Sequence, residues 1–130
     1  MQHKNLFEYA VIRIVPRVER EEFLNVGIVL YCADQKFLQA SFELNEARIK
    51  SFSPNVNTEL LHSYLCAFKL ICTGDIAGGP ISQLPAAERF RWLTAARSTM
   101  LQTSSVHSGL CLNAAETLEH LYNRLVLEPS

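Results

Sequence analysis

The stretch FEYAVIRIVPRVEREEFLNVGIVLYC, residues 7–32, decides the fold. Both of its ends alternate apolar residues at even positions with more varied residues at odd positions. Side chains alternate between the two faces of a strand, so each end predicts a strand with one apolar face. Between them, the polar segment 16–23 begins with proline and predicts a hairpin loop. The even apolar positions are Ala10, Ile12 and Ile14, then Leu24, Val26, Ile28, Leu30 and Cys32.

Further elements follow on the C-terminal side of this hairpin. Residues 36–43 alternate in the same way and predict a third strand that buries Leu38, Ala40 and Phe42, and residues 107–112 predict a fourth. Residues 58–72 repeat apolar side chains with helical period, a second helix follows Pro85, and Asn113 caps a third. We expect one α+β domain over residues 1–130. It should consist of an antiparallel sheet of three to four strands with about three helices packed on the even-residue face.

The odd-residue face of the hairpin is mixed in character. If the loop is symmetric about residues 19–21, Arg13 lies opposite Gly27, which leaves room for the arginine side chain, and Tyr9 lies opposite Tyr31. A face this apolar should be covered by a segment of the chain or by another protein. We therefore expect a protein partner or a homodimer on the sheet face formed by Tyr9, Arg13, Val29 and Tyr31.

Composition excludes several classes of protein. Hydrophobic residues make up 48% of the chain, enough for one ordinary core. The net charge of −1, from 12 basic and 13 acidic residues, disfavours nucleic-acid binding, which relies on a positive field. The four cysteines have no metal-ligand spacing and lie among apolar residues, which predicts buried thiols and neither metal nor cofactor. The N-terminus lacks a signal-peptide core and no apolar run approaches about 20 residues, so we expect a cytoplasmic protein without membrane contact.

Two polar stretches are candidates for a functional site, residues 17–27 and 96–109. Arginine presents a rigid fork of donors that matches phosphate or carboxylate, so one interpretation is an anion site in which Arg13, Arg97 and His107 surround an anion or Glu22. The other, which the sequence favours, is that these side chains satisfy backbone groups at helix ends and in loops. The candidate residues are Arg13, Glu22, Asn25, Gly27, Arg97, Ser98, Thr99, Gln102 and His107. Catalytic residues stay unknown, because no GxSxG elbow, P-loop or GxGxxG fingerprint is present.

Three segments carry a family resemblance: YAVIRIVPRVEREEFLNVGIVLY (9–31), RFRWLTAARSTMLQTSSVHSGL (89–110) and LEHLYNRLV (118–126). Together they resemble the bacterial family called domain of unknown function 3037, over nearly the whole chain. The resemblance implies a small cytoplasmic bacterial α+β protein and no particular substrate.

Two functions remain open. The first is a non-enzymatic binding or accessory protein that acts through a protein partner, which the mixed sheet face favours. The alternative is an enzyme or ligand-binding domain for a phosphorylated or nucleotide-like compound, using Arg13, Arg97 and His107.

Overall fold

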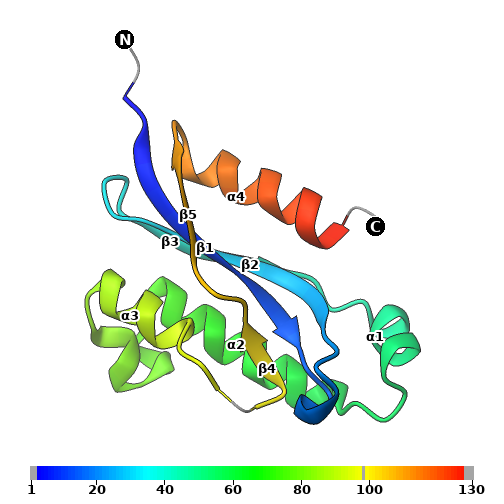
Figure 1. The fold of residues 1–130 in the computed structure, drawn as a ribbon. Helices are drawn as coiled ribbons and strands as arrows, with labels where there is room; N and C mark the ends of the chain where they lie inside the picture. The colour runs from blue at the N-terminus through cyan, green and yellow to red at the C-terminus, as the bar shows by residue number, and fades with distance from the viewer. Residues whose placement is uncertain (1–2, 98, 128–130) are drawn as a thin grey trace.

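The computed structural model describes residues 3–97 and 99–127. Within them the chain forms an antiparallel sheet of five strands and four α-helices (Figure 1), which confirms the α+β class. The strands are β1 (Asn5–Ile14), β2 (Leu24–Cys32), β3 (Phe37–Phe42), β4 (Leu101–Thr103) and β5 (His107–Cys111). The helices are α1 (Glu46–Phe52), α2 (Thr58–Thr73), α3 (Ala86–Leu93) and α4 (Ala114–Tyr122), followed by a π-helical turn, Asn123–Leu127. Strand β4 and helix α1 are additional to the predicted elements.

β1 is the central strand of the sheet. It pairs with β2 along one edge, and β2 pairs in turn with β3. The other edge of β1 is shared, because β4 pairs with residues 12–14 and β5 with residues 5–9. β2, β4 and β5 therefore pair directly with β1, and β3 is linked to it through β2. The sheet has two outer edges, which are β3 and the β4–β5 run (residues 101–111).

The register between β1 and β2 differs from the prediction. Arg13 lies opposite Asn25, Gly27 lies opposite Ile12, and Tyr9 lies opposite Leu30. The loop is not symmetric, because Val18–Arg20 forms a 3-10 turn, Glu21 adopts a left-handed conformation with φ of 56°, and Val26 is an extra, bulged residue. From Gly27 to Tyr31, the odd residues of β2 therefore share a face with the even residues of β1.

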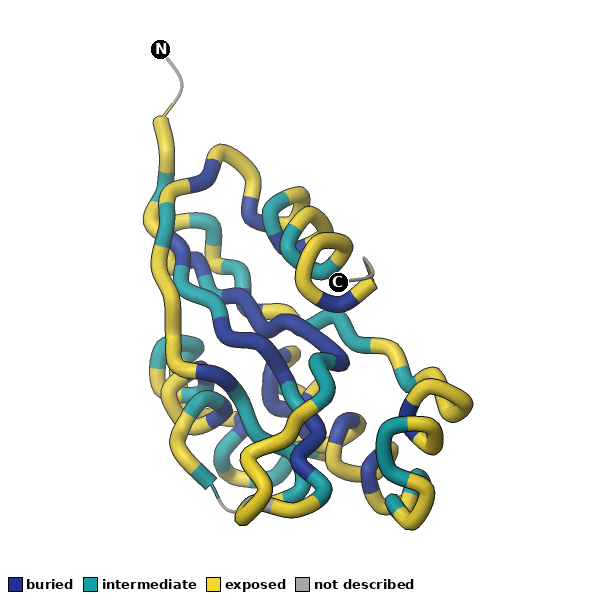
Figure 2. The backbone as a smooth tube through the Cα atoms, turned by 45° about the vertical axis from the view of Figure 1, so that its right-hand side comes forward, coloured by how far each residue is buried: buried dark blue, intermediate teal, exposed yellow. Residues whose placement is uncertain are grey.

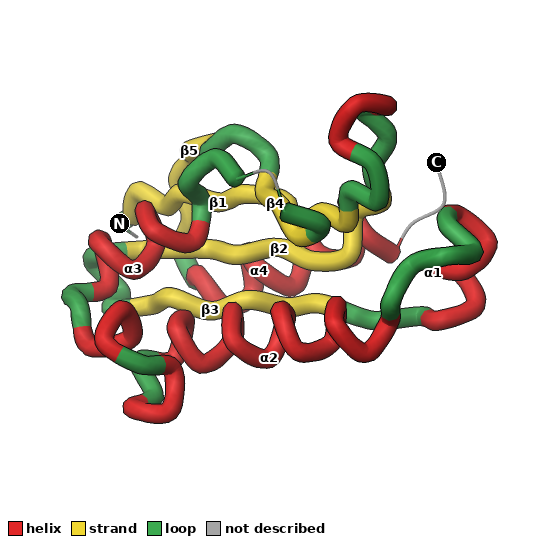
Figure 3. Tube along the Cα trace, turned by 90° about the horizontal axis from the view of Figure 1, so that it is seen from below, coloured by secondary structure: helices red, strands yellow, loops and turns green. Residues whose placement is uncertain are grey.

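Both faces of the sheet are apolar as a result. Ala10, Ile12 and Val29 face α2 and α3, whereas Val11 and Ile28 face α4. Figure 1 shows α4 on one side of the sheet and α2 and α3 on the other, and Figure 3 shows α2 running along β3 with α4 behind the sheet. The prediction that the helices pack on one face is therefore wrong: they cover both faces.

The register also divides the predicted partner face between the two sides of the sheet. Val29 is fully buried and Tyr31 stacks on Phe90 of α3 with ring centroids 5.6 Å apart, so both lie on the α2 and α3 side. Tyr9 packs with the cluster under α4, and Arg13, four residues further along β1, is on the same side as Tyr9. The four residues Tyr9, Arg13, Val29 and Tyr31 consequently do not form one surface.

The helix ends follow local sequence signals. Asn57 and Asn113 cap α2 and α4 by accepting hydrogen bonds from Leu60 N and Glu116 N, and Gly74 ends α2 in the left-handed region with φ of 71°. Helix α3 follows Pro85, as predicted, and ends at Leu93. No helix within the described residues has the length and apolar character needed to cross a bilayer.

One cysteine departs from the prediction of buried thiols. Cys66 is exposed on α2, while Cys32, Cys72 and Cys111 are buried. Burial raises the pKa of the Cys72 thiol to about 12.

Substitution of one isoleucine on each face tests the two-layer arrangement. Ile12 and Ile28 are fully buried on opposite faces, so Ile12→Ala and Ile28→Ala should each lower the free energy of unfolding by about 2–5 kcal/mol through lost burial and a cavity. Chemical denaturation measures both. The control Ile76→Ala removes an 83% exposed side chain and should change stability by less than about 0.5 kcal/mol. A loss that small at Ile28 would contradict a core beneath α4.

Candidate functional site

Three of the predicted site residues form a row across the sheet. Arg13 on β1 lies between Asn25 on β2 and Gln102 on β4, because each is its direct cross-strand partner. Direct partners in antiparallel strands project to the same face. The row therefore lies on the α4 side of the sheet, next to the turn that follows the C-terminal end of α4.

The guanidinium of Arg13 is partly enclosed. Its Cζ lies 3.9 Å from the ring centroid of Phe23, and desolvation lowers the pKa of Arg13. Arg13 Nε and Asn25 Oδ1 are both buried and have no hydrogen-bond partner in the described part of the chain. A buried polar atom without a partner costs about 1–3 kcal/mol, so a donor and an acceptor here remain free to take a partner.

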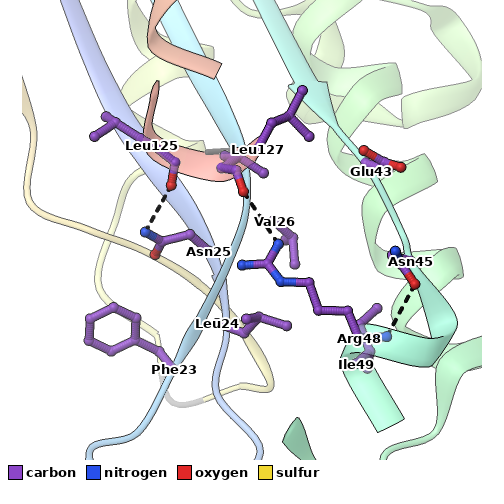
Figure 4. Close-up of a pocket in the computed structure, with 11 residues that line it drawn as sticks. Phe23, Leu24, Asn25, Val26, Glu43, Asn45, Arg48, Ile49, Leu125 and Leu127 are labelled. Atoms are coloured by element: carbon purple, nitrogen blue, oxygen red, sulfur yellow. Dashed lines mark hydrogen bonds between the residues drawn. The ribbon is translucent and has the colours of Figure 1, made fainter. Parts of the chain in front are cut away.

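A groove of about 710 Å³ opens beside this row (Figure 4), between the start of β2, α1 and the C-terminal turn. Asn25 Nδ2 donates to Leu125 O over 3.3 Å, and Arg48 Nη1 donates to Val126 O over 3.4 Å. These two hydrogen bonds hold the turn across the groove. The groove has the volume of a small-molecule site. Its lining residues are Phe23, Leu24, Asn25, Val26, Glu43, Asn45, Arg48, Ile49, Leu125, Val126 and Leu127.

Arg97 is committed to the end of helix α3. Its Nη1 donates to Leu93 O over 3.1 Å, its Nη2 donates to Trp92 O, and its Cζ lies 4.2 Å from the Trp92 ring centroid. Partial burial lowers the pKa of Arg97. These contacts satisfy carbonyls that a helix end leaves free, so Arg97 terminates α3.

His107 lies at the start of β5, opposite Tyr9, with ring centroids 5.3 Å apart. Tyr9 and Arg13 are four residues apart on β1, about 13 Å along a strand. The structure therefore does not bring Arg13, Arg97 and His107 to one point, contrary to the anion site that the sequence suggested. No cluster of three or more His, Cys, Asp or Glu suited to a metal occurs within the described residues.

The other candidates have structural roles or lie at the surface. Glu22 Oε1 pairs with Arg20 Nε at 2.5 Å, with both side chains exposed. A Cβ on Gly27 would lie 2.6 Å from Ser41 O, so this glycine makes room for β3 and not for Arg13. Thr99 Oγ1 donates to Leu101 O, and Gln102 Nε2 donates to Thr99 O, which stabilises the turn before β4. Ser98 lies outside the described residues.

The β4–β5 run is a second candidate surface. Three residues, Ser104 to Val106, lie opposite two residues of β1 between the paired segments, which makes a one-residue bulge. Ser104 bridges it: its N donates to Val11 O, and its Oγ accepts from Val11 N, both over 2.9 Å. Figure 2 shows this run along one side of the molecule, coloured mostly as exposed or intermediate.

The β4–β5 run carries no formal charge and exposes apolar side chains among polar ones. No Lys, Arg, Asp or Glu occurs between Arg97 and Glu116. Leu6 and Leu110 are cross-strand partners that are 57% and 63% exposed, and Leu112 is 51% exposed. The absence of charge is visible in the sequence, but the free edge depends on the pairing of β1, which the sequence does not specify. Phe23, Arg48 and Ser104 were not predicted as site residues, because their contacts with Arg13, Val126 and Val11 join segments that are distant in the sequence or in different elements.

Ser104→Ala tests how the bulge is held. The substitution leaves the buried N–H of Val11 without its acceptor, so the free energy of unfolding should fall by about 1–3 kcal/mol. Ser105→Ala, at an exposed neighbouring position, is the matched control and should be nearly neutral in the same denaturation experiment. Equal effects at the two serines would show that the Ser104 hydroxyl does not hold β4 and β5 to β1.

Comparison with known proteins assigns a family without an activity. The sequence model of the family described as "Protein of unknown function (DUF3037)" matches residues 9–126, so the chain belongs to that family. No curated protein and no solved structure matches the chain.

Proposed function

Because the DUF3037 family carries no assigned activity, the function has to be argued from the geometry of this chain, and we propose a non-enzymatic binding protein that acts through a protein partner. The partner adds a strand to the β4–β5 edge. The observation that supports this most directly is an outer strand with exposed apolar side chains and no charge.

Sheet edges of this kind are uncommon on proteins that act alone. An edge strand presents unpaired N–H and C=O groups, and proteins usually guard it with charged side chains, proline or a covering segment. Here residues 105–108 and 110 are exposed, and the bulge at 104–106 restricts pairing to β5. Addition of an extended segment would satisfy the backbone groups and cover Leu6 and Leu110.

We also propose that the protein acts in the bacterial cytoplasm. The four cysteines, three of them buried, are all free, which supports a reducing compartment.

The edge hypothesis is tested by affinity purification from the native host with three forms of the protein. Wild type should retain a stoichiometric partner, and Leu110→Lys should lose it, because a charge replaces an apolar contact on the edge. Ile76→Lys places the same charge on an exposed isoleucine outside the sheet and should retain the partner. A partner bound equally by all three forms would exclude the edge as the docking surface.

The alternative function is a ligand-binding domain or enzyme for a phosphorylated or nucleotide-like compound. The three residues that the sequence suggested for it have little support as a set. Arg97 donates to a carbonyl at the end of α3, and His107 pairs with Tyr9, which is four residues from Arg13 along β1. What favours it is that Arg13 Nε, which has no partner within the described residues, lies on the strand next to Asn25, and that Asn25 and Arg48 both line the groove.

Inorganic phosphate distinguishes this alternative by thermal denaturation. If Arg13 and Arg48 hold a phosphoryl group, phosphate should raise the melting temperature more than chloride at equal ionic strength. Arg48→Gln should abolish that increase, whereas Arg91→Gln on the exposed face of α3 should keep it. A melting temperature that does not respond to phosphate in the wild type would remove this alternative.

A further inference from the structure

We propose that the partner at the β4–β5 edge is a second copy of the same chain, paired antiparallel through β5 about a twofold axis so that two sheets join into one. This inference rests on the proposed function, since it names the occupant of the same edge. It differs from the homodimer suggested by the sequence, whose face is divided between the two buried sides of the sheet.

The backbone of β5 suits self-pairing. An outer strand directs the N–H and C=O of alternate residues away from the sheet, and two identical antiparallel strands satisfy each other's groups equally. β5 contains five residues with Gly109 at its centre. A twofold axis at Gly109 would place Ser108 of each copy opposite Leu110 of the other.

The lack of charge favours a second copy over an unrelated protein. In a twofold pairing, a residue on the axis lies opposite its own copy and a residue next to the axis lies diagonally across from its own copy, so a charged residue there would approach a like charge, which destabilises strand pairs. An unrelated partner carries no such restriction and usually gains specificity from complementary charges. The segment between Arg97 and Glu116 has no Lys, Arg, Asp or Glu, so no pair of these charges within it opposes self-pairing.

The exposed leucines supply the apolar contact. Leu110 and its partner Leu6 lie on the α2 and α3 side of the sheet, next to the edge. About an axis at Gly109 the two Leu110 side chains become diagonal neighbours, about 7–8 Å apart between backbones, within reach of leucine side chains. On the opposite side, a Cβ at residue 109 would lie 2.9 Å from the Phe7 ring, so that ring already covers Gly109. The apolar surface that self-pairing buries is therefore concentrated around Leu110.

Charge complementation at residue 110 tests the proposal. Sedimentation equilibrium of the wild type should show a reversible dimer. Leu110→Lys and Leu110→Glu should each raise the dimer dissociation constant by about tenfold or more, because two leucines are lost and like charges become neighbours. Mixing the two variants in equal amounts should restore a heterodimer, because the charges at the axis are then opposite. The control Ile76→Lys should dimerise as the wild type does, and circular dichroism should show all variants folded.

Hydrogen exchange locates the contact. The amides of residues 107–111 that point outward should gain protection as wild-type concentration rises, and should not do so in Leu110→Lys. A dimer that survives both Leu110 variants would place the contact elsewhere and overturn the inference. A wild type that is monomeric at every concentration would overturn it too. In that case, loss of a host protein by Leu110→Lys in affinity purification would still support the edge as a docking surface for another protein.

Discussion

The register between β1 and β2 is the constraint on which the rest of the molecule depends. Ala10 pairs with Val29 and Val11 pairs with Ile28, so each face of the hairpin receives apolar side chains from both strands. A sheet with two apolar faces requires a covering layer on each, and α2 with α3 on one side and α4 on the other provide them. Had the register moved by one residue, β2 would have turned its buried leucine and isoleucine to the other face.

With both faces covered, the surfaces left for function are the edges and ends of the sheet. The β4–β5 run can lie on β1 only because the bulge at Ser104 changes the alternation of faces. Leu101 packs toward α2 and α3 before the bulge, and Cys111 packs under α4 after it. The bulge thus lets one short run contribute to both cores, and the same kink keeps the exposed part of the run short.

Much of the fold could be predicted from the sequence because its signals are local. The alternation in residues 24–32 gives strand β2 its observed bounds, and Asn113 and Gly74 mark helix ends through their own side-chain or backbone preferences. The register could not be predicted, because a left-handed conformation at Glu21 and a bulge at Val26 are not marked by a glycine or asparagine in the sequence. Strand β4 has only three residues, too few for a recognisable alternation.

The candidate site shows why residues that are distinctive in the sequence need not take part in binding or catalysis. Arg97 and Gly27 are distinctive in the sequence, yet the first closes the end of α3 and the second admits the backbone of β3. Both roles depend on one particular residue type, since few side chains can reach two carbonyls and no side chain fits beneath Ser41. The features without such an explanation are different ones. They are Arg13 Nε and Asn25 Oδ1, which have no hydrogen-bond partner among residues 3–97 and 99–127, and the uncharged edge strand with Leu110. With both sheet faces covered, the fold retains these features at a cost in stability, and binding is the physical process that would recover that free energy.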